Sequence, residues 1–184
     1  MLGYLTASNP SLTKDEGSHP FTECATFADD IKGSGYSAQS DWHFMDQPYL
    51  NEPGTTLDDF SFEAADVDVV DALTDFTAFL KGETVKDSAY IKQVQDWFSD
   101  ENDQKSFALR LVIHYVGDLH QPLHATAEVN SEYTEGDRGG NEEWIPNTPE
   151  GVGNLHQIWD SVDFLYTGYP DLPMSDDLWD YYTT

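Results

Sequence analysis

The stretch His114-Tyr-Val-Gly-Asp-Leu-His-Gln-Pro-Leu-His124 decides how the rest of the chain is interpreted. The residues just before it are mostly apolar, which predicts a largely buried helix over residues 103–118. On that helix His114 and Asp118 are four residues apart and therefore project from one face. Pro122 ends or redirects the helix, and His124 follows two residues later. The sequence thus predicts that three side chains able to bind a metal converge where a buried helix ends.

The same spacing recurs further along the chain, in Asn154-Leu-His-Gln-Ile-Trp-Asp160. His156 and Asp160 are four residues apart at the start of a second predicted helix, residues 154–166. Neutral imidazole and carboxylate groups are ligands of zinc, and this spacing lets one helix provide two of them. A Gly-Gly-Asn sequence, residues 139–141, lies between the two His-x-x-x-Asp pairs. Two such pairs indicate a metal site far more strongly than one.

The order of these motifs resembles that of the zinc-dependent single-strand nucleases of the S1/P1 type, whose relatives include zinc phospholipases C and 3'-nucleotidases. The resemblance covers roughly residues 20–165, with insertions. Residues 25–32 are similar to the family's Ala-x-Trp-Ala-Asp motif, with Phe27 in place of Trp, and residues 42–46 to its His-Phe/Tyr segment. It implies an all-α fold. We expect residues 1–184 to form a single zinc nuclease domain that is incomplete at both ends.

The resemblance also implies which residues bind zinc. One ion would be held by Asp29, His43, His114 and Asp118, and a second by His124, His156 and Asp160. Asp118 would be the catalytic residue, because in the family this aspartate bridges the first zinc to a third. The Trp and His ligands of that third ion have no counterpart here, so this chain supports two sites. Without the resemblance, the residues favour a solvated carboxylate for Asp29 and a satisfied core histidine for His43.

Four further residues match or neighbour the family's substrate site. Phe44 and Asp46 match its base pocket, where a ring stacks on the base and a carboxylate accepts from the base edge. Stacking requires an unpaired base, which implies a single-stranded substrate; the alternative for Phe44 is core packing. Lys32 is a candidate phosphate contact, and Asn141 is expected to orient the loop or contact the substrate. We expect His120 to pack near the helix end and His19 to lie on the surface.

The implied activity is hydrolysis of single-stranded RNA and DNA to 5'-phosphorylated products, extending to 3'-nucleotidase action. Two alternatives stay open at this point. A phospholipase C would need an apolar site for the diacylglycerol half of its substrate. A zinc-binding remnant without catalysis would follow if the third metal site is required. The implied partners are zinc and single-stranded nucleic acid or nucleotides, and no protein partner is evident.

The composition limits these functions through its charge. The chain has 184 residues, 39% of them hydrophobic, which is enough for a core. It has 8 Lys and Arg against 35 Asp and Glu, a net charge of −27. Such a surface repels nucleic acid, which counts against a duplex-coating protein, but divalent ions can supply local positive charge in a metalloenzyme. An acidic surface suited to a salty or acidic milieu is the other interpretation.

The sequence also carries predictions about cellular location and secondary structure. Cys24 is the only cysteine, so no intrachain disulfide is possible, and no apolar run is long enough to span a membrane. No signal peptide is recognisable, whereas the family resemblance implies secretion or an extracytoplasmic location. Periodicity predicts further helices over residues 20–31, 59–80 and 87–98, and loops over 33–40, 48–58 and 125–153, with few strand signals.

Overall fold

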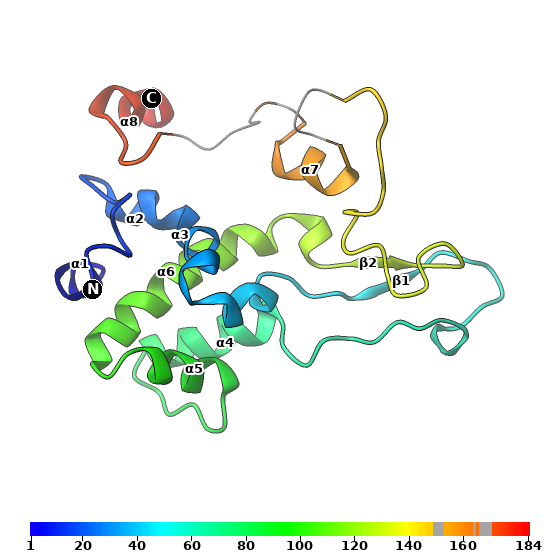
Figure 1. The fold of residues 1–184 in the computed structure, drawn as a ribbon, viewed down its shortest axis with the longest axis horizontal. Coiled ribbons are helices and arrows are strands. Elements are labelled where there is room, and N and C mark those ends of the chain that lie inside the picture. Colours follow the sequence, from blue (N-terminus) through cyan, green and yellow to red (C-terminus); the bar gives the residue numbers. More distant parts are fainter. Residues whose placement is uncertain (149–152, 164, 166–170) are drawn as a thin grey trace. The chain divides into compact units, whose positions relative to one another are not determined.

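The structure, a computed structural model, describes residues 1–148, 153–163, 165 and 171–184. It is mostly helical, which confirms the all-α class (Figure 1). The chain divides into two compact units: unit 1 comprises Met1–Trp42, Val69–Gly117 and Pro170–Thr184, and unit 2 comprises His43–Asp68 and Asp118–Tyr169. The long helix α6 (Glu101–Leu119) belongs to unit 1 as far as Gly117. That the whole chain acts as a single domain stays a prediction.

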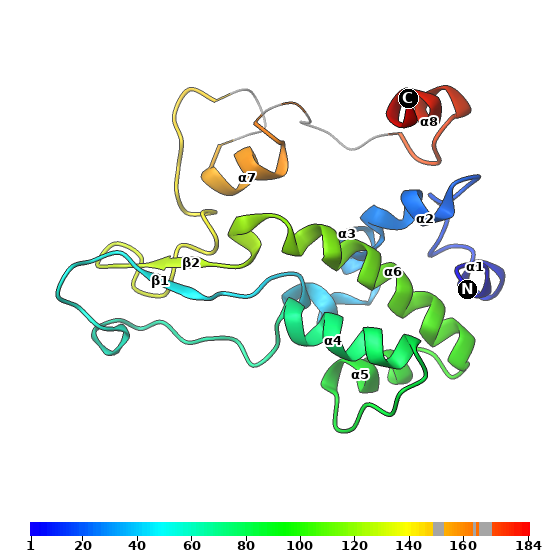
Figure 2. The same ribbon diagram turned by 180° about the vertical axis from the view of Figure 1, so that it is seen from behind.

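Unit 1 is built on the helices α4 (Val69–Leu80), α5 (Ala89–Trp97) and α6, which are the green segments in Figures 1 and 2. The Ser88 hydroxyl accepts from the Ile91 amide and caps α5. The Asp100 carboxylate accepts from the amides of Asn102 and Asp103 and caps α6. These capped starts confirm the helices predicted over residues 87–98 and 103–118. No helix in the described part of the chain has the length and apolarity that crossing a bilayer requires.

The core of unit 1 is aromatic. Along α6, Phe107, Leu111 and Tyr115 are fully buried at spacings of four residues, as expected for the inner face of a helix. The Phe107 ring contacts rings from two neighbouring segments, with centroid distances of 5.0–5.5 Å: Phe27, Tyr36, Trp97 and Phe98. A second group joins Trp42 to Phe76 of α4 and Tyr90 of α5. Packing of this kind fixes the position of α6, which carries His114.

The helix predicted over residues 20–31 is interrupted. It forms α2 (Pro20–Glu23), a 3₁₀ turn η1 (Cys24–Thr26) and α3 (Phe27–Asp30). The reason is that side chains from elsewhere in unit 1 take carbonyls that a continuous helix would use. His114 bonds the carbonyl of Ala25, and Gln39 donates to the carbonyl of Ala28 at 2.6 Å. The 3₁₀ turns η2 (Lys32–Ser34) and η3 (Ser37–Trp42) follow.

Two short helices of unit 1 were not predicted: α1 (Gly3–Ser8) and α8 (Asp176–Thr183). The signal for α8 is local, because the Ser175 hydroxyl accepts from the Leu178 amide and two acidic residues follow it. Trp179 of α8 stacks on His19 with ring centroids 3.9 Å apart. His19 is therefore half-buried, and its expected surface position is wrong.

Unit 2 has less regular structure. Strands β1 (Pro48–Leu50) and β2 (Ala127–Val129) pair in parallel, with Pro48 opposite Ala127 and Leu50 opposite Val129. The loops predicted for both segments are wrong, because three-residue strands are too short to show an alternating pattern. The unit also contains the 3₁₀ turns η4 (Leu57–Asp59) and η5 (Pro122–His124) and the helix α7 (Leu155–Asp160).

Two predicted helices are shorter in the structure. Of the helix predicted over residues 59–80, only α4 forms, because the earlier residues are held in unit 2: the Ser61 amide donates to the Thr134 carbonyl at 2.9 Å. The helix predicted over 154–166 ends at Asp160. Val162 and Asp163 adopt positive φ values of 51° and 55°, which end a right-handed helix. Of the residues at the end of this predicted helix, 164 and 166 lie outside the described residues.

Candidate metal centre

Unit 1 brings together Asp29 of α3 and His114 of α6. His114 is buried, and its Nδ1 bonds the Ala25 carbonyl. A carbonyl only accepts, so Nδ1 carries the proton and the lone pair is on Nε2. That Nε2 lies 3.7 Å from Oδ2 of Asp29, while Oδ1 of Asp29 accepts from Lys32 at 2.7 Å. The imidazole is thus oriented with its lone pair toward a carboxylate, as in many metal sites.

Unit 2 brings together His43 and Asp118. The Nδ1 atom of His43 lies 2.9 Å from Oδ2 of Asp118, and the other oxygen of Asp118 lies 3.9 Å from Nδ1 of His124. His124 Nδ1 donates to the carbonyl of His43 at 3.0 Å, and the Met45 amide donates to the carbonyl of His124 at 2.7 Å. These bonds tie residues 43–45 to 3₁₀ turn η5 and place Asp118 between the two imidazoles.

The second group in unit 2 consists of His124, His156 and Asp160, whose ligand atoms all lie within 4.8 Å of one another. The two imidazole rings stack with centroids 4.9 Å apart. His156 donates from Nδ1 to the Gly139 carbonyl at 2.8 Å, and its Nε2 lies 3.4 Å from Asp160. The Nε2 atom of His124 lies 3.9 Å from the same carboxylate. Both imidazoles therefore direct a lone pair toward one carboxylate, with Nδ1 held by a backbone carbonyl.

This donor set fits zinc. Two neutral imidazoles and one carboxylate form the protein part of a common catalytic zinc site, which leaves further positions for water and substrate. A metal-ligating histidine typically donates its other ring N–H to a backbone carbonyl or carboxylate, which fixes the tautomer and the ring orientation. His124 and His156 meet that condition. The chemistry of the residues present thus supports a metal at this group.

Two residues that position this group were missed from the sequence. Gln121 donates from its amide to Asp160 at 3.0 Å and accepts from the Leu123 amide at 2.6 Å. Asp137 is buried and accepts from the amides of Glu128, Gly139 and Gly140 at 2.8–3.1 Å, which shapes the turn that offers the Gly139 carbonyl to His156. The available signal was their position, since Gln121 lies within the His114–His124 stretch and Asp137 lies two residues before the Gly-Gly-Asn sequence.

The turn at residues 137–140 requires glycine. Gly139 has a φ of 63°, and a side chain there would bring its Cβ to 2.2 Å from the Leu123 carbonyl oxygen. This close approach connects the turn directly to the 3₁₀ turn that carries His124. The start of α7 is anchored to the same loop, because the amides of Leu155 and His156 donate to the carbonyls of Glu143 and Gly140 at 2.9 and 3.2 Å.

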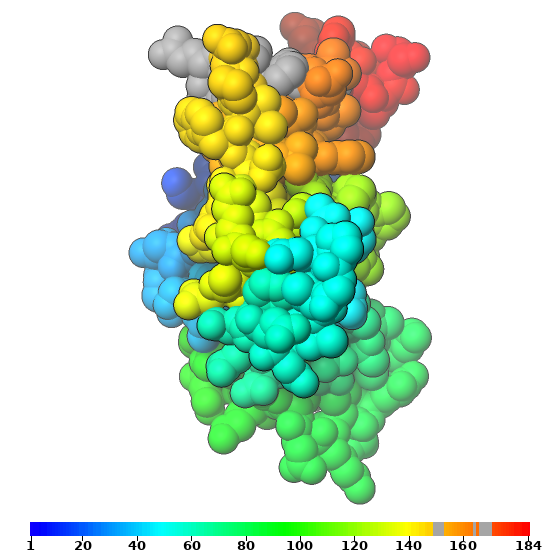
Figure 3. Space-filling view, turned by 90° about the vertical axis from the view of Figure 1, so that its right-hand side faces the viewer, coloured from blue at the N-terminus to red at the C-terminus, as the bar shows by residue number. Residues whose placement is uncertain are grey.

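The rest of that loop also lies against α7. Figure 3 shows the loop, in yellow, beside α7, in orange. Trp144 pairs with Asn154 in an isolated antiparallel bridge, and the Ile145 amide donates to the Gly153 carbonyl at 3.0 Å. The Asn154 side chain accepts from the Gln157 amide and caps the helix. The long polar loop predicted from the sequence thus fixes where α7 begins and where His156 points.

The predicted substrate residues take different positions. Phe44 and Asp46 are half-buried in unit 2. Burial raises the pKa of Asp46, the charge of Asp137 raises it further, and Arg138 counteracts both. Asn141 donates from its amide to the Arg138 carbonyl at 2.9 Å, so it supports the turn. Direct substrate contacts by these residues, and by Lys32, stay predictions.

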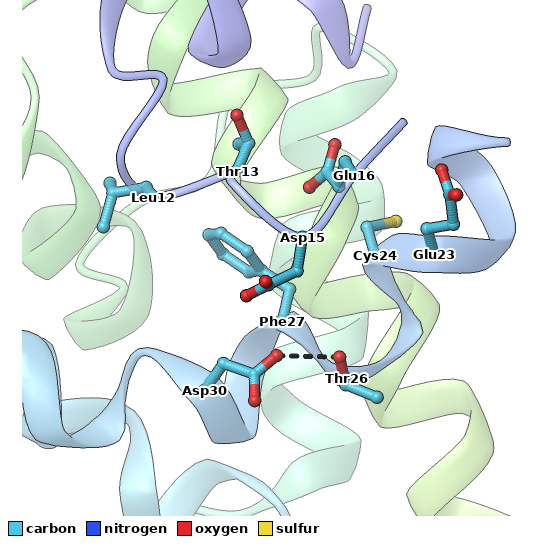
Figure 4. A pocket seen from close by; sticks show the side chains of 9 residues that line it. All are labelled: Leu12, Thr13, Asp15, Glu16, Glu23, Cys24, Thr26, Phe27 and Asp30. Atoms are coloured by element: carbon cyan, nitrogen blue, oxygen red, sulfur yellow. Dashed lines mark hydrogen bonds between the residues drawn. The ribbon is translucent and has the colours of Figure 1, made fainter. Parts of the chain in front are cut away.

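His120 and a pocket of unit 1 stand apart from these groups. His120 is exposed and belongs to neither group. Figure 4 shows the pocket, which is lined by a cysteine, four carboxyl groups and other side chains: Leu12, Thr13, Asp15, Glu16, Glu23, Cys24, Thr26, Phe27 and Asp30. Thr26 donates to Asp30 at 2.7 Å, and Glu23 accepts from the amides of Gly17 and His19. Burial, followed by the charge of Glu16, raises the pKa of the Cys24 thiol to about 12, so it is no nucleophile.

Comparison with known proteins identifies the family. Compared with curated proteins one by one, the chain has no match. The family model described as S1/P1 nuclease matches residues 5–164, a span that includes every predicted metal ligand. The predicted resemblance is therefore confirmed, and the chain is a nuclease, a hydrolase of phosphodiester bonds. With most of its length matched and with imidazoles and carboxylates gathered in both units, the chain belongs to the S1/P1 nuclease family.

Proposed function

We propose that this protein is a zinc-dependent nuclease that cleaves single-stranded RNA and DNA and leaves 5'-phosphorylated products. The observation that carries the proposal is the group of His124, His156 and Asp160, in which backbone carbonyls hold both Nδ1 atoms and leave both Nε2 atoms directed at one carboxylate. Family membership supports the nuclease activity, and the donor chemistry supports zinc.

We assign the metal ligands that the family resemblance implies. His124, His156 and Asp160 would hold one zinc, and Asp29, His43, His114 and Asp118 another. The pairs Asp29–His114 and His43–Asp118 support the second assignment. A bound zinc supplies Lewis-acid polarisation of the phosphate and lowers the pKa of a water molecule toward neutrality. Because ligands are drawn from residues 29 to 160, we propose that residues 1–184 act as one zinc nuclease domain.

The other residues of the site would bind and orient the substrate. Asp118 would be the catalytic carboxylate, as the family resemblance implies. The Phe44 ring would stack on an unpaired base, which gives the preference for single strands. Asp46 would accept from the edge of that base, as the family resemblance implies. As in the family, we propose that the protein acts outside the cytoplasm.

The test combines metal counting with cleavage assays. Zinc content is measured by elemental analysis of the purified chain, and cleavage is followed on a short single-stranded oligonucleotide and on its duplex. The expected result is about two zinc ions per chain, faster cleavage of the single strand, and products that a 5'-phosphate-dependent ligase accepts. Equal rates on both substrates would overturn the single-strand preference. Full activity in a zinc-free, chelator-treated sample would overturn the zinc dependence.

A further inference from the structure

Arg138 is the only Lys or Arg in the sequence of unit 2, within a chain whose net charge is −27. Unit 2 carries five of the seven proposed zinc ligands. The substrate of a nuclease is a polyanion, and most of its attraction to a protein comes from Lys and Arg side chains on phosphates. Among the side chains of this unit, a permanent positive charge is therefore available at one position only.

The turn that carries Arg138 is rigidly held. The carboxylate of Asp137 accepts from three backbone amides, and the Arg138 carbonyl accepts from the Asn141 amide at 2.9 Å. Arg138 has a φ of 56°, in the left-handed region that a side chain other than glycine adopts at a cost. Strained backbone of this kind concentrates at functional sites, where surrounding bonds maintain it. The side chain itself is exposed, so it is accessible to a ligand.

The position of Arg138 connects it to the metal group and to the proposed base pocket. The next residue, Gly139, accepts from His156 at 2.8 Å, and adjacent Cα atoms are about 3.8 Å apart. Arg138 also acts on Asp46, whose pKa it lowers against the effects of burial and Asp137. Asp46 follows Met45, whose amide donates to the His124 carbonyl. The backbone of Arg138 therefore adjoins the residue that bonds His156, and its charge reaches Asp46.

Two cations of unit 1 are already paired with carboxylates, whereas the guanidinium of Arg138 is available. Lys32 is paired with Asp29 at 2.7 Å, and Arg110 with Glu16 at 2.6 Å. Within the described residues, no hydrogen bond or ion pair engages the side chain of Arg138. A guanidinium with its five donors available binds phosphate oxygens in a two-pronged arrangement that Lys does not reproduce.

We propose that Arg138 is a substrate-binding residue that holds a backbone phosphate of the single strand beside the His124–His156–Asp160 group, an inference that rests on the proposed nuclease function. Its task is to bind and position the strand, while the carboxylates and imidazoles carry the metal chemistry. It would also offset locally the repulsion between an acidic protein and a polyanion.

The variants are Arg138→Gly, Arg138→Lys and, as a matched control, Lys92→Ala on α5 of unit 1. Glycine suits the positive φ, so this truncation removes the guanidinium without adding backbone strain. Lys92 is exposed, and its replacement removes the same charge. Steady-state cleavage of the zinc-loaded enzyme is measured on a short single-stranded oligonucleotide, and binding of the same oligonucleotide is measured by fluorescence anisotropy at several salt concentrations.

We expect Arg138→Gly to raise KM about tenfold, because a charge-assisted bond is lost, with little change in kcat and no loss of melting temperature. Arg138→Lys should fall between Arg138→Gly and wild type, and Lys92→Ala should match wild type. In Arg138→Gly the slope of the logarithm of the binding constant against the logarithm of salt concentration should be more positive than in wild type by about 0.7, the value for one single-strand phosphate contact. A KM and salt slope equal to those of Lys92→Ala would overturn the proposal.

The binding measurement distinguishes a failure of this proposal from a failure of the proposed nuclease function. If the wild type binds the oligonucleotide through Arg138 but does not cleave it, the nuclease proposal fails and the Arg138 assignment stands. If the wild type cleaves with kinetics and binding that are insensitive to Arg138→Gly, the reverse holds. A lower melting temperature at unchanged KM would show that Arg138 serves the turn alone, which also overturns the proposal.

Discussion

Charged and ionisable side chains are arranged very differently in the two units. In unit 1 the Arg110 side chain is fully buried, and it donates to both carboxylate oxygens of Glu16 at 2.6 Å. Its remaining N–H groups donate to Ser106, Thr6 and the Leu2 carbonyl. In unit 2, His124, His156 and Asp160 converge, and the same group contains no Lys or Arg.

This difference separates a structural site from a functional one. The guanidinium and carboxylate of unit 1 neutralise each other and use all their donors, so the group needs nothing from outside the protein. The imidazoles of unit 2 direct lone pairs at a carboxylate, an arrangement that is completed by a cation. The Arg110–Glu16 group should therefore be stable without metal, whereas the His124–His156–Asp160 group should depend on it.

The largest expected effect concerns Asp118, the proposed catalytic carboxylate near the end of α6. Asp118→Asn keeps the shape of the side chain but removes the charge, so kcat/KM on single-stranded substrate should fall by more than the roughly 10–100-fold typical of residues that only support a metal ligand. Circular dichroism should show an unchanged fold. His120→Ala is the control, because His120 is two residues away and belongs to neither metal group. Its kcat/KM should fall far less. Similar losses in both variants would contradict the assignment of Asp118.

The second prediction tests directly whether the two groups have different roles. Glu16→Gln leaves the Arg110 charge buried without a partner, so the free energy of unfolding should fall by about 3–5 kcal/mol. Asp160→Asn should leave the stability of the metal-free protein nearly unchanged and weaken zinc binding instead. Urea unfolding and zinc titration of both variants check this. If Asp160→Asn destabilises the metal-free chain as much as Glu16→Gln does, the distinction between the two groups is wrong.

Metal removal should affect the units unequally. Metal binding contributes to folding wherever the ligands come from separate segments, as His124, His156 and Asp160 do. After chelation, amide hydrogen exchange should accelerate in β2, residues 137–140 and α7, while α5 and the part of α6 in unit 1 stay protected. Mass spectrometry of exchanged peptides gives the measurement. Uniform acceleration across both units would mean that the metal stabilises the chain as a whole.

Salt provides a smaller effect. Raising the sodium chloride concentration to 1 M shortens the screening length to about 3 Å and reduces repulsion among the acidic groups that give the chain its charge of −27. We expect the melting temperature to rise by about 2–4 °C for each kcal/mol by which the free energy of unfolding increases. Cleavage should also become faster over the first additions of salt, since an acidic surface repels the substrate. A steady fall of rate with salt would indicate attraction instead.

The smallest effect concerns Cys24 of unit 1. Its pKa, raised to about 12 from 9.0, keeps the thiol protonated at neutral pH. At pH 8 the native protein should react with a thiol reagent far more slowly than the urea-unfolded chain, with or without zinc. Because the folded pKa is the higher one, the contribution of this group to stability is complete below pH 9 and falls between pH 9 and 12. Rapid reaction of the native protein would show that Cys24 is accessible.

Local patterns were enough to predict the class of the protein, its longest helix and its candidate ligands. The apolar spacing before His114 predicted α6, and the His-x-x-x-Asp pairs and the Gly-Gly-Asn sequence pointed to zinc and to the family. The four-residue spacing of His156 and Asp160 does place them in one group. Helix periodicity carries this information because both partners lie within one turn of the same element.

Tertiary contacts decided the features that depend on distant partners. The helix predicted over residues 20–31 breaks where His114 and Gln39 take its carbonyls, and the first half of the helix predicted over 59–80 is held against Thr134. Gln121 and Asp137 position the metal ligands through bonds that no local pattern reveals. Arg138 gains its significance from the same source. A lone arginine in the sequence is ordinary, whereas a turn fixed by Asp137 places it next to the residue that bonds His156 and lets its charge act on Asp46.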